Sequence, residues 1–250
     1  MLKDLVLSSI KSCKVFYFNQ VQRDDWVAGQ AADLSPGASV LDVGAGSCPY
    51  RMFFLHCDYK AQDFQGLTPE QLREQSGYGK IDYHCDATNI PVPDSCYDAV
   101  LCTEMLEHVP EPINVIKEIA RILKPGGKVI MTAPLGSGIH QSPYHFYGGY
   151  TPYWYDKFLS EFGFEEISVE PNGGFFKFYG QESMRFIQMT VPWKLNAAHI
   201  FRFLWAPAWL LCLICFFLLI PLCNLLDSYD KEKDFTVGYH VTARKACNKT

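Results

Sequence analysis

The stretch that decides the fold is Val40-Leu41-Asp42-Val43-Gly44-Ala45-Gly46. The segment 39–43 is short, and Val40, Leu41 and Val43 make it mostly apolar, as a strand inside a parallel sheet should be. Gly44 and Gly46 follow at once, and glycine directly after a strand lets the backbone turn tightly and approach a ligand closely. The pattern indicates a ligand-binding turn at the edge of a sheet, although a tight turn without a ligand has the same short sequence.

Short apolar segments alternate with helical segments around this turn. Strands are predicted at 39–43, 59–62, 81–85, 97–103 and 128–133, and two more at 166–170 and 237–243. Helices are predicted at 49–56, 112–123 and 151–162, the last with Thr151 as N-cap and Pro152 in its first turn. Such alternation implies right-handed crossovers and an α/β fold with a mainly parallel sheet.

Acidic residues follow several of the predicted strands. Ligands of open parallel sheets bind beyond the carboxyl ends of the strands, which is where Asp63, Asp86 and Glu104 fall. One acid after a strand is usually a solvated turn residue, but three acids after consecutive strands are harder to ascribe to turns. Asp58 is the alternative to Asp63 if the second strand is shifted.

A dinucleotide is the direct competitor for this edge. The dinucleotide fingerprint requires a third glycine where this chain has Pro49. Asp42 also places a negative charge close to where a pyrophosphate would lie. The sulfonium and amino groups of S-adenosylmethionine are positive, so the sequence favours S-adenosylmethionine over NAD.

Five ordered motifs resemble the class I S-adenosylmethionine-dependent methyltransferases. They cover about 37–174 and match the small-molecule, methyltransferase type 11-like branch most closely. The motifs are 40–46, Cys85-Asp86-Ala87-Thr88-Asn89-Ile90-Pro91, Tyr97-Asp98-Ala99-Val100, Thr103-Glu104-Met105-Leu106-Glu107-His108-Val109 and Ile119-Ala120-Arg121-Ile122-Leu123-Lys124-Pro125-Gly126-Gly127.

The resemblance implies a Rossmann-like seven-stranded sheet with an antiparallel last strand and helices on both faces. It also implies the residues that bind the cofactor: Asp42, Gly44, Ala45, Gly46, Asp63, Asp86, Ala87 and Glu104. Asp42, Gly44 and Gly46 would line the methionine moiety, and Asp63 would accept hydrogen bonds from the ribose hydroxyls. Asp86, with the amide of Ala87, would read the adenine edge, and the backbone of Glu104 would lie beside the methionine.

The loop at 140–151 is the expected wall for the methyl acceptor, and it resembles a His-x-x-Pro-Tyr stretch of the same branch. Methyl transfer needs in-line approach, and a base is needed only if the acceptor must lose a proton. His140 and His145 are the candidate bases. The candidate substrate contacts are His108, Tyr144, Tyr147 and Tyr150. The alternative is an aromatic loop that packs on the sheet edge.

The run at 203–226 contains no charged residue and is long enough to span a membrane. Pro207 and Pro221 are expected to break it, and the last strand must rejoin the sheet. We therefore expect a bent helical hairpin that dips into one leaflet, preceded by an interfacial helix at 184–203. A buried hairpin or a homodimer surface is the alternative. Cys212 and Cys215 lack a second ligand pair, and no metal site is predicted.

The domain boundaries predicted from these patterns are a helical cap at 1–36, a cofactor-binding core at 37–180, an apolar insertion at 181–230, and the last strand with a tail at 231–250. The net charge of −5 and the lack of a dense basic run argue against nucleic acid as a partner. Ten irregularly spaced cysteines and the absence of a visible secretory signal favour a cytosol-facing protein. Asn248-Lys249-Thr250 is treated as a chance sequon.

These patterns predict an enzyme that transfers a methyl group to a small or lipid-linked acceptor, at or near a membrane surface. The apolar run favours a hydrophobic acceptor. A non-catalytic cofactor-binding or scaffold protein of the same fold is the first alternative, and an NAD-dependent oxidoreductase is the second.

Overall fold

The computed structural model describes residues 15–73 and 77–247. Cys13, the first part of the predicted cap and the sequon at 248–250 lie outside these residues. The chain forms two compact units. The sheet unit contains Arg23–Glu170 and Gly238–Thr250, and the helical unit contains Met1–Gln22 and Pro171–Val237. Each unit is described by itself.

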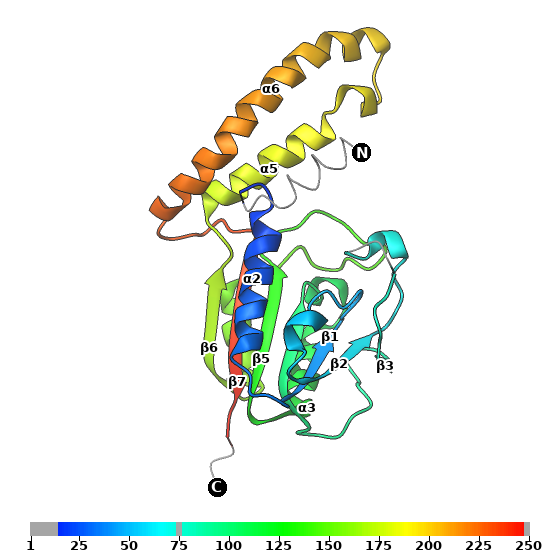
Figure 1. Cartoon of the computed structure of the whole chain (residues 1–250), viewed down its shortest axis with the longest axis vertical. Helices are drawn as coiled ribbons and strands as arrows, with labels where there is room; N and C mark the ends of the chain where they lie inside the picture. The colour runs from blue at the N-terminus through cyan, green and yellow to red at the C-terminus, as the bar shows by residue number, and fades with distance from the viewer. Residues whose placement is uncertain (1–14, 74–76, 248–250) are drawn as a thin grey trace. The chain divides into compact units, whose positions relative to one another are not determined.

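The sheet unit is built on a seven-stranded sheet with the order β3-β2-β1-β4-β5-β7-β6. Its strands are β1 (Ser39–Val43), β2 (Asp58–Asp63), β3 (Tyr83–His84), β4 (Tyr97–Thr103), β5 (Leu123–Pro134), β6 (Phe164–Pro171) and β7 (Gly238–Lys245). The pairs from β3 to β5 are parallel, and β7 runs antiparallel to β5. Figure 1 shows this arrangement, and the Rossmann-like fold with an antiparallel last strand is confirmed.

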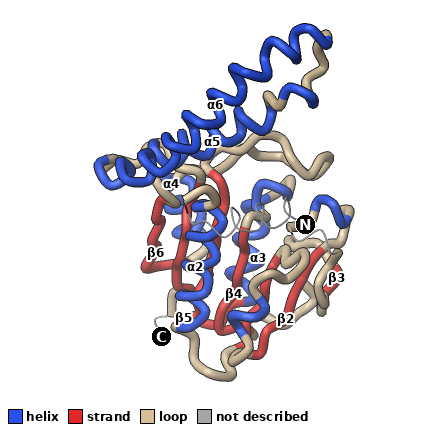
Figure 2. The backbone as a smooth tube through the Cα atoms, turned by 45° about the horizontal axis from the view of Figure 1, so that its top comes forward, coloured by secondary structure: helices blue, strands red, loops and turns tan. Residues whose placement is uncertain are grey.

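Helices cover both faces of this sheet because alternate strand residues point to opposite faces. Val40, Ala99 and Ile130 pack in one buried cluster with residues of α2 (Phe18–Ala32). The other face contacts α3 (Pro112–Ile122) and α4 (Pro152–Glu161) through a second cluster, which includes Leu41, Val43, Val100, Val129 and Met131. The elements can be followed in the tube drawing (Figure 2).

The chain order reverses between β1 and β4, since β2 and β3 lie on one side of β1 while β4 and β5 lie on the other. A crevice opens outside the carboxyl ends of the strands at such a point, and ligands of open α/β sheets bind there. The turn after β1 and the segment after β4 therefore flank the expected ligand position.

Some predicted elements differ from the structure. The helix predicted at 49–56 is only a short 3-10 helix, η1 (Arg51–Phe54), and β3 has two residues. The stop predicted at 124–127 ends α3 correctly, but the segment continues directly into β5. Thr151 precedes α4 without a side-chain capping hydrogen bond. These errors occur where the predicted element is short and tertiary pairing outweighs local propensity.

The unit boundaries also differ from the predicted ones. The sheet unit begins at Arg23, inside the predicted cap, because Val27 and Ala31 of α2 are fully buried in the cluster around Val40. The segment that leaves this unit is 171–237 rather than 181–230.

The helical unit contains two long helices that pack on each other, α5 (Phe175–Met189) and α6 (His199–Leu226). The indole Nε1 atoms of Trp205 and Trp209 donate to the carbonyls of Thr190 and Ile187. At the other end, the Asp227 carboxylate accepts hydrogen bonds from backbone amides at the start of α5. A carboxylate suits a helix N-terminus, where amides lack partners within the helix.

The break predicted at Pro207 and Pro221 is wrong. Both prolines lie inside α6, which is continuous over 28 residues, so the hairpin consists of α5 and α6 rather than two halves of the apolar run. A proline inside a helix costs about 3 kcal/mol or more. The contacts of α6 with α5, including the ring pair Phe186–Phe216, provide stabilisation that the sequence pattern does not reveal.

Candidate functional site

The glycine turn after β1 has the backbone geometry that its sequence predicts. Gly44 and Gly46 have φ angles of 72° and 52°, in the left-handed region that favours glycine. The amides of Gly44 and Ala45 both donate to the carbonyl of Gln62, at 3.0 Å each. A Cβ at Gly44 would overlap Cγ of Met105, so this turn packs directly against the segment after β4. Only glycine fits at this position without moving Met105.

Asp63 is the acidic residue at the carboxyl end of β2, whereas Asp58 begins that strand at its amino end. Asp63 Oδ2 accepts a hydrogen bond from the amide of Gly46 at 2.9 Å, and Oδ1 accepts one from Gln65 at 2.7 Å. Burial raises the pKa of this carboxyl, while the two backbone hydrogen bonds lower it. Asp63 is thus fixed beside the glycine turn, with lone pairs left for further donors.

Asp42 is buried within the sheet, and its carboxylate accepts a hydrogen bond from the Tyr59 hydroxyl. Burial raises the pKa of Asp42 to about 7, although the hydrogen bond from Tyr59 opposes this shift. A carboxyl with this pKa is partly protonated near neutral pH. A cation bound beside the turn would favour its ionised form.

Asp86 and Ala87 follow β3 as predicted, but their surroundings differ from each other. Asp86 is exposed, and its Oδ1 accepts hydrogen bonds from the amide and hydroxyl of Thr88 at 2.8 and 2.7 Å. Ala87 is buried in the same cluster as Leu41 and Val43. The carbonyl of Cys85 accepts from the side chain of Gln62, which ties this segment to the glycine turn.

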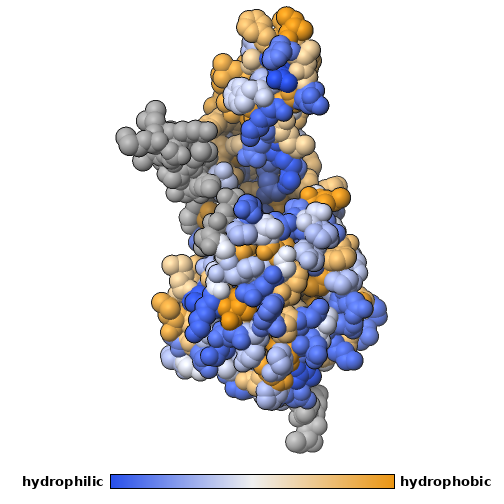
Figure 3. Space-filling model, turned by 90° about the vertical axis from the view of Figure 1, so that its right-hand side faces the viewer, coloured by the Kyte–Doolittle hydropathy of each residue, from blue (hydrophilic) through white to orange (hydrophobic). Residues whose placement is uncertain are grey.

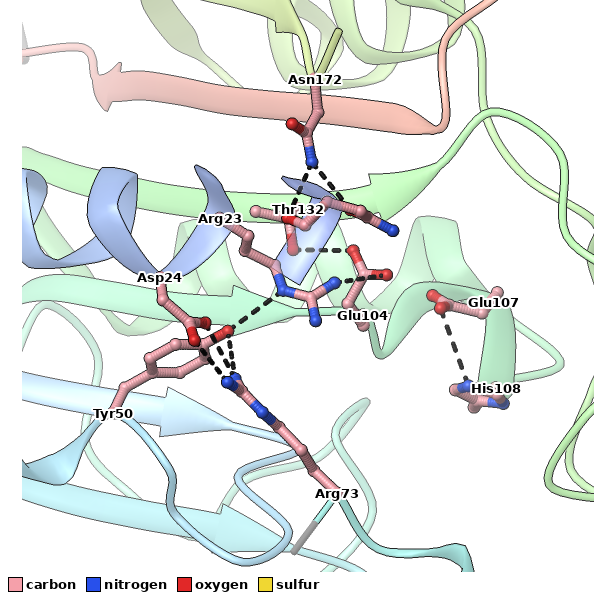
Figure 4. A network of polar contacts seen from close by, with 10 residues as sticks. Arg23, Asp24, Tyr50, Arg73, Glu104, Glu107, His108, Thr132 and Asn172 are labelled. Atoms are coloured by element: carbon pink, nitrogen blue, oxygen red, sulfur yellow. Dashed lines mark hydrogen bonds and ion pairs between the residues drawn. The ribbon is translucent and has the colours of Figure 1, made fainter. Parts of the chain in front are cut away.

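Glu104 lies after β4 with a φ of 48°, and it belongs to a polar network that sequence reasoning missed (Figure 4). Arg23 of α2 forms an ion pair with Glu104 at 2.9 Å and donates to the Tyr50 hydroxyl at 3.1 Å. Arg73 also donates to Tyr50, and it pairs with Asp24. Burial alone would lower the pKa of Arg23, but Glu104 and Tyr50 raise it above the usual value.

This network brings a guanidinium from the predicted cap to the residues after β1 and β4. Arg23 has only 13% of its side chain exposed, and Glu104 has 34%. No local pattern could have indicated the pair, because the two residues lie 81 positions apart in the sequence. Their proximity follows from the packing of α2 on the sheet.

Three histidines meet beside the segment after β4. The ring centroids of His108, His140 and His145 lie 4.6 to 5.8 Å apart. Burial lowers the pKa of His108 to about 4, and the hydrogen bond to the Tyr144 carbonyl opposes this. Burial and the neighbouring His140 also lower the pKa of His145. His108 and His145 are therefore neutral at pH 7.

The buried carboxyl of Glu107 lies next to this cluster, with its Oε1 atom 3.7 Å from Nε2 of His108. Burial and the nearby Glu104 raise the pKa of Glu107. Its backbone carbonyl accepts the amide of Phe146 at 2.9 Å, which holds the histidine-bearing loop against the end of β4.

The predicted tyrosines have different surroundings. Tyr150 is only 4% exposed, donates to the carbonyl of Leu106 at 2.8 Å and has its ring centroid 4.5 Å from that of Trp154, so burial keeps it from contacting an acceptor. Tyr147 is exposed, with its hydroxyl 2.9 Å from the carbonyl of Pro110. Tyr144 packs edge-on against Phe64 and supplies its backbone carbonyl to His108. Tyr144 and Tyr147 remain the better candidates for contacting an acceptor.

His240 on β7 makes the folding stability of the sheet unit sensitive to acid. It is buried, stacks on Trp26 at 4.7 Å, and has a pKa lowered to about 4 by burial and by Arg23. The unfolded chain binds a proton at about pH 6.5, so this group makes folding less favourable as the pH falls from about 6.5 to about 4. The shift of the His240 pKa from about 6.5 to about 4 lowers the free energy of unfolding in acid by roughly 3 kcal/mol at most.

We expect His240→Phe, which keeps a ring against Trp26, to remove this loss. Urea unfolding at pH 7.5 and pH 4.5 measures it, because the free energy of unfolding should fall less in the variant than in the unsubstituted protein. An equal fall in both proteins would show that His240 does not titrate as described. His199→Phe, at an exposed histidine of α6, is the control.

The sheet unit is the part of the chain that matches known proteins. Residues 41–131 match a family model described as a methyltransferase domain. The ubiquinone biosynthesis O-methyltransferase of Xanthomonas campestris pv. campestris (strain B100) is 36% identical over 119 residues, which are 44% of this chain and 48% of that protein. The chain thus aligns with about half the length of this curated relative.

Solved structures show the same fold at low identity. A putative sarcosine dimethylglycine methyltransferase from Galdieria sulphuraria has a TM-score of 0.55 and 18% identity, covering 90% of this chain and 86% of its own. The [4+2]-cyclase SpnF has a TM-score of 0.54 and 20% identity, covering 92% and 82%. The matched segment spans β1 to β5 with the glycine turn and the residues after β4. This segment is therefore similar to a methyltransferase domain, and the sheet around it has the Rossmann-like fold of these solved structures.

Proposed function

We propose that the chain is an S-adenosylmethionine-dependent methyltransferase whose acceptor is a small hydrophobic or lipid-linked molecule at a membrane surface. The observation that carries this proposal is the group of side chains at the carboxyl edge of the sheet. The glycine turn, Asp63 and Glu104 follow β1, β2 and β4, and the histidine cluster adjoins the same edge.

The charges at this edge suit the methyl donor. S-adenosylmethionine carries a positive sulfonium and amino group and a negative carboxylate. Asp42 and Glu104 are acidic groups near the turn, and the guanidinium of Arg23, which pairs with Glu104 in the structure, is a group of the type that binds carboxylates. A pyrophosphate would meet two acids here, which disfavours NAD.

The histidine cluster gives the transfer step a means of removing a proton. A hydroxyl acceptor must lose its proton at or before methyl transfer, and a neutral imidazole within hydrogen-bond reach can take it. His145 and His108 are neutral at pH 7, and His140 is exposed at the same place. We therefore retain His140 and His145 as the candidate bases, with Tyr144 and Tyr147 contacting the acceptor.

The helical unit supports a hydrophobic acceptor and contact with a membrane. The most apolar 18-residue window within His199–Tyr229 has a mean hydropathy of 2.6, yet only 11% of that window is buried. Figure 3 shows apolar side chains, mixed with hydrophilic ones, at the end where α5 leads into α6. The large exposed apolar residues of α6 are Ile200, Phe201, Phe203, Leu204, Leu210, Leu211, Ile214, Phe217, Leu218, Leu222 and Leu225. Water disfavours such a surface, which marks an interaction site.

Chain connectivity favours insertion into one leaflet over a single crossing. The segment 171–237 leaves the sheet after β6 and returns at β7, and these strands are neighbours in the sheet. A crossing by α6 would require a second crossing by α5, whose Lys177, Glu182 and Arg185 are costly in hydrocarbon. An α5–α6 hairpin lying in the interface avoids both costs. The nine described cysteines are free thiols, which suits the cytosolic face.

The membrane contact predicts binding to phosphatidylcholine vesicles in a flotation assay. Leu211 and Leu218 are 62% and 73% exposed on α6. Leu211→Glu and Leu218→Glu should each weaken binding about 10-fold or more, because each buried leucine contributes roughly 1.5 kcal/mol or more.

The matched control changes exposed apolar residues of the sheet unit. Met52→Glu and Leu55→Glu, at positions 67% and 82% exposed, should leave flotation unchanged. If the unsubstituted protein does not float and instead has the mass of a dimer that Leu218→Glu dissociates, the apolar surface is a homodimer interface.

The cofactor assignment is tested by calorimetry with S-adenosylhomocysteine and with NAD. We expect S-adenosylhomocysteine to bind and NAD to bind far more weakly. Tighter binding of NAD would overturn the assignment in favour of an oxidoreductase. One protein of this fold is named a cyclase, so the fold alone does not fix the reaction, and a turnover measurement is needed as well.

A further inference from the structure

The three histidines have an arrangement that exceeds the needs of a general base. One ring nitrogen from each of His108, His140 and His145 lies within 4.8 Å of the other two. His108 is in the short helix η3 (Leu106–His108) after β4, and the other two are in the loop after β5. A single base would need one imidazole, whereas three nitrogens converging on one point are typical of a metal site.

The tautomers of two rings are set by backbone carbonyls. Nδ1 of His108 pairs with the carbonyl of Tyr144, and Nδ1 of His140 pairs with the carbonyl of Gly138 at 2.9 Å. A carbonyl accepts only, so each Nδ1 carries the hydrogen and each Nε2 keeps its lone pair. Metal-bound histidines commonly have such a carbonyl partner on their other nitrogen.

The third ring has one nitrogen without a partner. Nδ1 of His145 is buried and has no hydrogen-bond partner among the described residues. An unpaired buried nitrogen costs roughly 1–3 kcal/mol. A ligand that accepts its lone pair would remove this cost, and the two neighbouring lone pairs can bind the same ligand.

We propose that His108, His140 and His145 form a binding site for a divalent first-row transition metal, with Zn²⁺ as the best fit. Neutral imidazole suits Zn²⁺, whereas Mg²⁺ prefers oxygen ligands. At a Zn–N distance of about 2.0–2.1 Å, tetrahedral geometry places the nitrogens about 3.3 Å apart. The nitrogens must therefore approach by at most about 1.5 Å, which the loop that carries His140 and His145 can accommodate.

Three protein ligands leave the fourth tetrahedral position open. Catalytic zinc sites have this form, and the metal lowers the pKa of a hydroxyl or water bound there. If the proposed methyl transfer holds, the acceptor class is a molecule whose hydroxyl binds the metal before it is methylated. An imidazole whose lone pair binds the metal cannot also act as a base, so the metal would replace the proton-removing role given above to His140 and His145. This consequence rests on the proposed function, whereas binding of the ion does not.

Metal binding is tested on the full-length protein after removal of metals with a chelator. Calorimetry should show a single Zn²⁺ bound per chain, and Co²⁺ should give the visible absorption of a nitrogen-ligated site without thiolate charge-transfer bands. His140→Ala and His145→Ala should each weaken Zn²⁺ binding by more than about 100-fold, because loss of a second-shell partner alone costs about 10- to 100-fold. Mg²⁺ should not compete.

Two control variants separate this site from other ligands. His199→Ala removes an exposed histidine of α6, and Cys212→Ser with Cys215→Ser removes two thiols of that helix. Both variants should leave Zn²⁺ affinity unchanged. The proposal is overturned if Zn²⁺ does not bind, if binding survives His140→Ala, or if the cysteine variant abolishes it.

The same samples show whether the variants are folded and whether the enzyme assignment stands. S-adenosylhomocysteine affinity and circular dichroism should be unchanged in His140→Ala, since that side chain is exposed. Methyl transfer in a protein that binds no metal would contradict only the metal site. Zn²⁺ binding in a protein without methyl transfer would contradict only the proposed function.

Discussion

Gly44→Val is expected to lower S-adenosylhomocysteine affinity by about 100-fold or more. The new Cβ would overlap Cγ of Met105, and the φ of 72° disfavours any side chain at this position. The turn must therefore shift by about an ångström, and a misplacement of that size can cost on the order of 100-fold. Isothermal titration with S-adenosylhomocysteine measures the effect.

The matched control is Gly37→Val, at a glycine with a φ of 79° where an added Cβ would have nothing within 4 Å. It carries the same penalty for a left-handed residue, about 1–2 kcal/mol, without the collision. We expect a lower melting temperature but unchanged affinity. Equal loss of affinity in both variants would show that Gly44 acts only through stability.

Asp63→Asn is expected to lower S-adenosylhomocysteine affinity by roughly 10- to 100-fold. Hydrogen bonds to a charged group contribute about 1.5–3 kcal/mol, and the amide would also place a donor against the amide of Gly46 or Gln65. The substitution therefore removes the negative charge of Asp63 and disturbs the backbone of the turn at the same time. Competition of unlabelled ligand with labelled S-adenosylmethionine measures the change.

Asp58→Asn is the control, because Asp58 is exposed at the opposite end of the same strand. It should bind the cofactor normally. If Asp58→Asn weakens binding and Asp63→Asn does not, the ribose contact has been assigned to the wrong acid. The S-adenosylmethionine assignment itself would stand.

The sheet could be predicted from the sequence because its strands are buried on both faces. A short run of apolar residues such as 99–102 is typical of a strand buried on both faces, and glycine directly after β1 marks the turn. The prolines of α6 led to a wrong prediction for the opposite reason. Local propensity predicts a break there, but contacts with α5 at Trp205 and Trp209 depend on residues distant in the sequence.

The candidate site could be predicted only in part. Asp63 and the glycines lie directly after strands, so their shared edge follows from topology. Arg23 and the convergence of His108 with His140 and His145 depend on how α2 and a long loop pack. The spacing of the histidines matches no regular metal motif, so the sequence alone predicts no metal site.

The most direct test of the central claim is transfer of a labelled methyl group from S-adenosylmethionine to components of a cell extract. The extract would be separated into lipid, protein and small-molecule fractions, with Asp63→Asn as the impaired variant and Asp58→Asn as the control. We predict label in the lipid fraction, reduced only by Asp63→Asn. Tight cofactor binding with no label in any fraction would contradict the claim and indicate a non-catalytic binding protein.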